Sequence, residues 1–332
     1  MKPQDFSQLD LIQLTFGCKS TRPATLPPFL GSTLRGAFGH AFKQVACALE
    51  GPTRCAQTCQ QPAQCRYAFL FETAVPQHQS PNHRHQDIPH PYLLIPPLVH
   101  YSVSRIGFKE GDPLEFGIIL MGEAINLVLL VTVAVELMLD QGLGSSRTPF
   151  QLASVTAWGK TQICSIEKPK PDTEALYAAI TPLSNVIERR LAPLNPLAES
   201  LTLRFLTPLR LRKGGNLQDS IGFVDIVRHL MRRMETLTEA FGSAPPRVDT
   251  ERLPALASQI QTTANSLWWN DMERFSNRQQ TKLKLGGLMG EICFSGPVLA
   301  EFLPLLAAGE VLHIGTATTF GLGRYELLHD LK

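Results

Sequence analysis

The alternation of apolar and polar residues predicts the same series of elements in each half of the chain. In the first half, strands are expected at 9–16, at 114–121 and up to Trp158, with helices at 31–46 and 123–139. In the second half, strands are expected at 201–211, 284–294 and 323–328, with helices at 221–241 and 298–308. Two units of the order strand, helix, strand, strand, helix, strand predict an α+β protein made of two tandem ferredoxin-like domains.

Prolines separate the two predicted units. Those at positions 169, 171, 182, 193 and 196 punctuate a segment that we expect to be a linker. The predicted N-terminal domain therefore covers residues 1–167, the linker 168–196 and the C-terminal domain 197–332. A cysteine-rich insertion at about 47–97 is expected to interrupt the N-terminal domain.

The composition is that of a globular protein with enough apolar residues for two cores. The chain has 332 residues, 44% of them hydrophobic, and a formal net charge of +2. Its N-terminal segment is charged and polar throughout, so we expect no signal peptide and a cytoplasmic protein. The apolar run 124–139 contains Glu136 and is shorter than the ~20 residues of a membrane span, so we expect a buried helix and no membrane contact. So small a net charge neither requires nor excludes a nucleic-acid partner.

The first predicted helix, 31–46, divides into two faces. The apolar face comprises Leu34, Ala37, Phe38, Ala41, Phe42 and Val45. The polar face comprises Ser32, Arg35, Gly36, Gly39, His40 and Lys43. Each glycine inside a helix costs about 1 kcal/mol relative to alanine, which favours a surface that another molecule approaches closely. A solvated face with glycines used for packing is the alternative.

Four cysteines follow this helix, at Cys47, Cys55, Cys59 and Cys65. In a reducing compartment, four thiols within about 20 residues are more typical of metal ligands than of disulfides. Zinc is the expected metal, in a structural site that staples the excursion between the helix and a strand expected at FLFET, 69–73. The spacing lacks a CxxC pair, and unliganded thiols remain the alternative.

Basic residues cluster in the second half of the chain. Those expected to contact phosphates are Arg210, Arg212, Lys213, Arg274, Arg278, Lys282 and Lys284. No acidic residue interrupts the run from Arg204 to Lys213, and the later group follows the aromatic pair Trp268 and Trp269. Cations that neutralise phosphates beside aromatic rings that stack on bases are typical of nucleic-acid binding. A solvated strand edge with core tryptophans is the alternative.

A glycine-punctuated loop lies near the end of the chain. The segment 312–327, LHIGTATTFGLGRYEL, places Gly315, Gly321 and Gly323 between two expected strands. Such glycines let backbone N–H groups approach a phosphate without a Cβ in the way. A plain β-hairpin or bulge would give the same pattern.

Four segments together resemble a known family. They are LPPFLGSTLRGAFGHAFKQVAC (26–47), CRYAFLFET (65–73), WWNDMERFSNRQQTKLKLGGLMGEICFSG (268–296) and HIGTATTFGLGRYEL (313–327). These segments are similar to the CRISPR-associated endoribonucleases of the RAMP superfamily, which process precursor CRISPR RNA. The resemblance implies two tandem ferredoxin-like, RRM-like domains. It also implies that the ligand is CRISPR repeat RNA and that cleavage needs no catalytic metal and leaves a 2′,3′-cyclic phosphate.

The resemblance also implies roles for individual residues. His40 takes the place of the family's general acid or base, with Lys43 and Arg35 as candidates for stabilising negative charge on the phosphorane. Gly315, Gly321 and Gly323 take the place of the family's glycine-rich loop, with Thr318, Thr319 and Arg324 either close to the RNA backbone or packing the loop. Other subunits of a CRISPR effector complex are further expected partners. The competing hypotheses are a RAMP subunit that binds CRISPR RNA without cutting it, and a zinc-stapled protein-interaction module.

Overall fold

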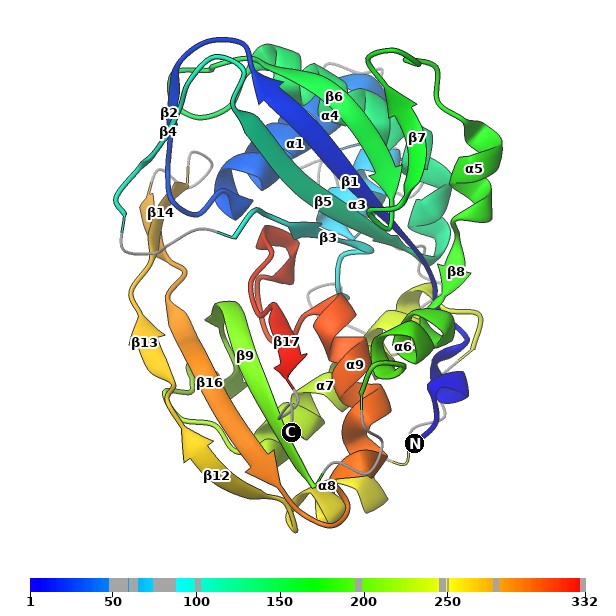
Figure 1. Ribbon diagram of the computed structural model, residues 1–332, viewed down its shortest axis with the longest axis vertical. Helices are drawn as coiled ribbons and strands as arrows, with labels where there is room; N and C mark the ends of the chain where they lie inside the picture. The colour runs from blue at the N-terminus through cyan, green and yellow to red at the C-terminus, as the bar shows by residue number, and fades with distance from the viewer. Residues whose placement is uncertain are drawn as a thin grey trace. The chain divides into compact units, whose positions relative to one another are not determined.

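The computed structural model describes residues 1–47, 59, 65–73, 88–98, 103–194, 199–244, 249, 251–276 and 281–328. The chain divides into two compact units (Figure 1). The first unit contains residues 9–181 with 239–242, and the second contains 1–8, 182–238 and 243–332.

The first unit is built on an antiparallel sheet. Its strand order is β3 (Tyr92–Ile95), β5 (Pro113–Met121), β1 (Asp10–Ser20), β6 (Phe150–Ala157) and β7 (Thr161–Ser165). Helix α1 (Gly31–Ala46) lies between β1 and β3 in the chain, and α4 (Val128–Gln141) lies between β5 and β6. Both helices lie on the same side of the sheet, behind it in Figure 1, and pack against each other.

Helix α4 is the most apolar element of this unit. With the 3-10 turn Gly122–Leu127 it forms a 20-residue segment of mean hydropathy 1.9, which by length and composition alone could cross a membrane. Its residues Val128, Val131 and Val135 are buried in the core, beside α1 and β6. The helix expected at 123–139 is therefore present and faces the core.

One expectation for the segment between α1 and β5 is wrong. FLFET is not a strand but the end of helix α3 (Arg66–Glu72), because Ala68 and Phe71, three residues apart, are both buried and Thr73 ends the helix in the left-handed conformation (φ 48°). The expected insertion, 47–97, also contains β3, whose Leu93 and Leu94 are fully buried at the edge of the sheet.

The segment expected as a linker is not irregular. It carries α5 (Thr173–Ala178) and α6 (Leu183–Leu191), and the division between the units lies between residues 181 and 182. Asp172 caps α5 by accepting a hydrogen bond from the Ala175 N–H at 2.9 Å. Helix α6 buries Leu183 and Ile187 in the second unit, so burial rather than propensity fixes this helix.

The second unit repeats the connection order of the first. Its sheet order is β12 (Gln261–Asn265), β16 (Gly287–Ser295), β9 (Ser200–Leu209) and β17 (Tyr325–Leu328), all antiparallel. Helix α7 (Phe223–Phe241) follows β9, and α9 (Leu303–Leu312) follows β16. The Phe223 ring meets the rings of Phe294 and Phe302 at 4.9 and 5.0 Å and joins sheet to helices.

The second unit also contains shorter strands. Strand β13 (Trp268–Asn270) pairs with β16. Strands β14 (Glu273–Ser276) and β15 (Thr281–Lys284) form a separate two-stranded sheet, and β10 (Arg212–Lys213) and β11 (Asn216–Leu217) form another. In each unit, the last strand of the strand, helix, strand, strand, helix, strand order pairs with the first: β6 pairs with β1, and β17 pairs with β9.

Candidate active site

Helix α1 has the two predicted faces. Leu34, Phe38 and Phe42 are buried in the core of the first unit, and the ring of Phe38 lies 6.0 Å from that of Tyr92. Burying a phenylalanine side chain stabilises a fold by roughly 1.5–3 kcal/mol. The rotation of α1 about its axis is therefore fixed, and so is the direction of its polar face.

One stripe of that polar face, Arg35, Gly39 and Lys43, packs along α3. The Arg35 guanidinium lies 5.9 Å from the ring centroid of Phe71, and the Lys43 Nζ lies 5.7 Å from that of Tyr67. A Cβ added at Gly39 would lie 3.0 Å from the Phe71 ring, so this glycine lets α3 approach. Packing against α3 therefore explains Gly39, for which the sequence allowed either packing or the close approach of another molecule.

The neighbouring stripe, Gly36, His40 and Gln44, is exposed. The Gln44 side-chain oxygen accepts a hydrogen bond from Gln141 at 2.7 Å, and its Nε2 lies 2.9 Å from Nε2 of His40. With its oxygen turned to Gln141, the Gln44 amide donates to His40, which places the ring proton on Nδ1. Among the described residues, and leaving out the backbone of α1 itself, no atom lies within 4 Å of a Cβ placed on Gly36. The imidazole is thus oriented by a neutral partner beside open space.

His40 differs from the other histidines that the structure describes. Burial, assisted by the charge of Arg35, lowers the pKa of His90 to about 4. Burial also lowers the pKa of His313 well below its usual value. Both ring nitrogens of His229 face backbone carbonyl oxygens, at 2.8 and 3.1 Å. Within the described chain, His40 is therefore the histidine placed for proton transfer with a molecule from solvent.

Residues near α1 that the sequence did not single out contribute to this site. Gln44 and Gln141 orient His40, and Tyr67 stacks on Phe71 at 5.2 Å beside Lys43. Burial raises the pKa of Tyr92 to about 12 and keeps its hydroxyl protonated near neutral pH. Of these residues, Gln44 could have been found from the sequence, because it lies four positions after His40 and therefore beside it on a helix.

The cysteine set is only partly described. Cys47, Cys59 and Cys65 are half-buried and form no disulfide, and Cys65 precedes the first turn of α3. Cys55 lies outside the described residues. Within the described residues, no three His, Cys, Asp or Glu side chains form a group that could hold a metal ion. Zinc stays a prediction.

The glycine-rich loop of the second unit packs on its own chain. Gly315 has φ +90°, and a Cβ there would lie 2.5 Å from the Arg210 carbonyl oxygen. The Thr316 N–H donates to that same oxygen at 3.0 Å, and the Gly323 N–H donates to Pro208 at 3.1 Å. Close approach to the end of β9 is therefore a sufficient reason for these glycines.

The other residues expected to place the loop beside RNA are largely enclosed. Thr318 and Thr319 are buried in the 3-10 turn η5 (Thr318–Phe320), and Gly321 ends that turn in the left-handed conformation. Arg324 is half-buried, and its N–H donates to the Thr207 hydroxyl at 2.9 Å. The burial of Thr318 and Thr319 favours the alternative in which they pack the loop.

The basic run of β9 is not one surface. Arg210 is buried and its guanidinium donates to the Gly286 carbonyl, so it holds the end of β9 rather than facing solvent. Arg204 is exposed but bonded to Glu291 at 2.6 Å and Glu326 at 2.9 Å. Only Arg212 and Lys213 of the predicted phosphate contacts in this run are exposed.

Trp268 and Trp269 are not core residues. Their side chains are 50% and 38% exposed on β13, and the Trp269 indole N–H donates to Asp271 at 3.0 Å. Lys284 is exposed at the end of β15. The backbone carries Arg274 on β14 and Lys282 on β15, whereas Arg278 lies outside the described residues.

Comparison with known proteins finds a family model for each part of the chain. Residues 9–177 match the AF_1859_N model, described as an N-terminal domain, and residues 203–325 match the model of the CRISPR-associated endoribonuclease Cas6. Residues 203–325 are a domain of the Cas6-type RAMP proteins. The Cas6 match spans the glycine-rich loop, and the AF_1859_N match spans α1 with His40.

Solved Cas6 structures share the fold. Thermus thermophilus Cas6 is 14% identical with a TM-score of 0.52, covering 96% of this chain and 99% of that one. A Cas6 product complex is 16% identical with a TM-score of 0.53, covering 96% and 100%. A partial Cas6-RT-Cas1–Cas2 complex is 16% identical with a TM-score of 0.56, covering 98% and 47%. An uncharacterized protein of Archaeoglobus fulgidus is 23% identical over 305 residues, 91% of this chain and 92% of that protein.

Proposed function

We propose that this Cas6-type protein cleaves precursor CRISPR RNA within its repeat, using two tandem ferredoxin-like domains. The ribose 2′-OH attacks the adjacent phosphate and leaves a 2′,3′-cyclic phosphate and a 5′-OH. The observation that carries the proposal is the placement of His40, exposed on α1 with its ring oriented by Gln44 at 2.9 Å and open space at Gly36.

In this reaction the protein must hold the RNA in the reactive geometry, transfer protons and stabilise negative charge. The nucleophile is tethered next to the reacting phosphorus, which replaces a bimolecular encounter with an intramolecular step. The unperturbed pKa of histidine lies near neutrality, so His40 is suited to take the 2′-OH proton or protonate the leaving 5′-oxygen. Lys43 and Arg35, on the next stripe of α1, supply positive charge for the phosphorane. Their contacts with the Tyr67 and Phe71 rings fix where that charge lies.

The direct test uses RNA and the whole chain. Repeat RNA incubated with the protein in EDTA should yield fragments with a 2′,3′-cyclic phosphate. A substrate with a single 2′-deoxyribose upstream of the scissile phosphate should bind and stay intact. Tight binding of repeat RNA without cleavage under all conditions would replace the proposal with the non-cutting RAMP subunit.

We expect the exposed tryptophans to bind RNA bases. Stacking of a base on an aromatic ring contributes about 1–3 kcal/mol, so Trp268→Ala and Trp269→Ala should each weaken repeat-RNA binding about five- to hundredfold. Fluorescence anisotropy of labelled RNA measures this. Trp158→Phe is the matched control, because the Trp158 indole N–H donates to the Ala179 carbonyl within the first unit. Equal affinities for all three variants and the wild type would contradict the stacking role.

We also expect about one zinc ion per chain, held by Cys47, Cys55, Cys59 and Cys65. A tetrathiolate site would stabilise the segment between α1 and α3 and leave no position open for substrate. Metal analysis of protein purified without chelator measures the stoichiometry, and Cys59→Ser should lower the melting temperature more than the cleavage rate. Cys164→Ser is the control, since Cys164 is buried in the sheet. Metal-free protein with an unchanged melting temperature would contradict the site.

Complexes with other proteins are a further part of the proposal. One solved relative is a Cas6-RT-Cas1–Cas2 complex. We propose other CRISPR subunits as partners of this chain, in addition to repeat RNA.

A further inference from the structure

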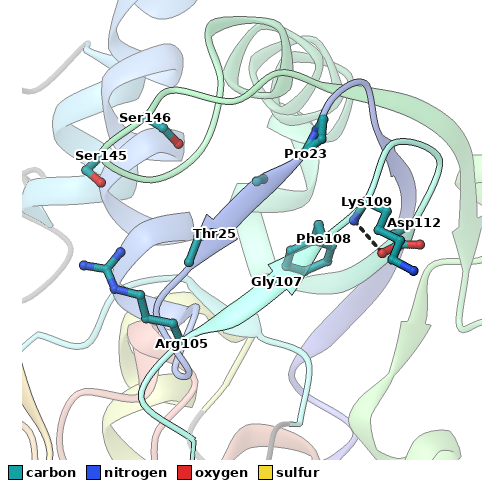
Figure 2. A pocket seen from close by; sticks show the side chains of 10 residues that line it. Pro23, Thr25, Arg105, Gly107, Phe108, Lys109, Asp112, Ser145 and Ser146 are labelled. Carbon is teal, nitrogen blue, oxygen red and sulfur yellow. Dashed lines mark hydrogen bonds between the residues drawn. The ribbon is translucent and has the colours of Figure 1, made fainter.

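A pocket of about 580 Å³ lies in the first unit, lined by residues that neither the fold nor the proposed cleavage explains. One side is the two-stranded ribbon of β2 (Ala24–Leu26) and β4 (Ile106–Phe108), and across from it lies the turn Ser145–Ser146 (Figure 2). Phe108 contributes an apolar wall and is held by the Phe150 ring at 5.6 Å. A volume of this size is typical of ligand pockets.

The lining is positively charged. Arg105 and Lys109, on either side of β4, are exposed, and their side chains make no hydrogen bond or ion pair with a residue that the structure describes. Asp112 is the acidic residue of the lining, and its carboxylate accepts the Lys109 backbone N–H at 2.6 Å. By contrast, Arg252 is paired with Glu301 at 2.6 Å. The two cations of the pocket are therefore available to an anion.

Hydroxyl groups and open backbone complete the lining. Thr25, Ser145 and Ser146 expose hydroxyls that can donate to phosphate oxygens. At Gly107 no atom of the described part of the chain, its two chain neighbours aside, lies within 4 Å of an added Cβ, so a ligand can approach the β4 backbone. Cations, hydroxyls and accessible backbone are the groups that contact phosphates in nucleic-acid complexes.

The turn that carries the serines is built rigidly. Leu143 and Thr148 exchange two backbone hydrogen bonds, at 2.8 and 3.1 Å. Gly144 has φ +75°, and a Cβ there would lie 2.6 Å from Leu26 on β2. The glycine brings the turn close to the ribbon, so the hydroxyls are held in place before any ligand arrives.

We propose that this pocket binds a phosphodiester segment of single-stranded RNA, separate from the reacting phosphate at His40. The proposal rests on the proposed RNA substrate and assigns part of the protein's affinity for that RNA to Arg105 and Lys109. The pocket is open along the ribbon and flanked by unpaired cations at both ends of β4, which suits a continuing backbone better than a closed mononucleotide site.

The test measures repeat-RNA affinity against salt concentration for the full chain. Arg105→Ala and Lys109→Ala should each weaken binding about three- to tenfold, and each should reduce the slope of log affinity against log salt by about 0.7 for a lost single-strand phosphate contact. Arg105→Glu with Lys109→Glu should weaken it further. Lys160→Ala is the matched control, an exposed lysine in the turn between β6 and β7 that does not line the pocket. Unchanged affinity and slope in the double glutamate variant would overturn the proposal.

Two further arms separate the outcomes. The single-turnover rate at sub-saturating RNA should fall in the Arg105→Ala and Lys109→Ala variants in proportion to their lost affinity, and Lys160→Ala should keep the wild-type rate. Titration with AMP distinguishes a free nucleotide: tight AMP binding that Arg105→Ala abolishes, with RNA affinity unchanged, would overturn the RNA proposal. Because affinity is measured apart from cleavage, failure of the wild type to cut RNA would reject the nuclease without deciding the pocket.

Discussion

Replacing His40 by alanine is expected to slow single-turnover cleavage of repeat RNA by about 10² to 10⁴ fold. The expectation follows from its place on α1, where the ring is exposed and bonded to the Gln44 amide. Its removal exposes no buried group, so the melting temperature and RNA affinity should stay close to wild type. The measurement is the cleavage rate at saturating enzyme.

Two control variants separate chemistry from packing. Gln44→Ala leaves the imidazole in place but removes its orienting partner, so the rate should fall by about tenfold or less. His229→Gln changes a histidine whose ring is held by backbone carbonyls in the second unit, and cleavage should stay within about threefold of wild type. Cleavage by His40→Ala within about threefold of wild type would show that His40 is not the catalyst.

The parts of this protein that could be predicted from the sequence are those with a strong local period. Helix α1 begins and ends at the expected residues because its apolar residues recur every three or four positions over 16 residues. The apolar segment of α4 and the alternating strand β9 were also found. The exposed face of α1 that carries His40 could be predicted for the same reason, since its place opposite Phe38 and Phe42 is set by helical geometry.

The parts that could not be predicted depend on residues far apart in the chain. The acids that neutralise Arg204 lie 87 and 122 residues away, on strands paired with β9. The partner of Arg210 lies 76 residues away at Gly286, and the backbone that Gly315 approaches belongs to Arg210 itself. A run of basic residues in the sequence therefore does not tell which of their side chains are exposed and unpaired. The register of the sheet decides which charged side chains lie beside each other.

Gly323→Ala is expected to destabilise the second unit by about 3–5 kcal/mol, which is large against a typical total of about 5–15 kcal/mol. Gly323 has φ +70°, where a side chain is strained. An added Cβ would also overlap the Ile314 carbonyl oxygen, and that residue's N–H donates to the Gly323 carbonyl at 3.0 Å. Moving the backbone at Ile314 or at Gly323 away would break the hydrogen bond between these two residues. Moving Gly323 would also break the hydrogen bond from its N–H to the Pro208 carbonyl.

Thermal melting and RNA binding together decide what the loop glycines do. Gly323→Ala should lower the melting temperature by roughly 6–20 °C, at about 2–4 °C per kcal/mol for a unit of this size. Gly36→Ala is the control, since it adds a methyl group to open space in a helix and should stabilise by about 1 kcal/mol. If Gly323→Ala melts like the wild type but binds repeat RNA more weakly, the glycine serves the RNA backbone. If it loses stability while its folded fraction keeps the wild-type affinity, the glycine serves the fold, and the phosphate contacts lie on other residues.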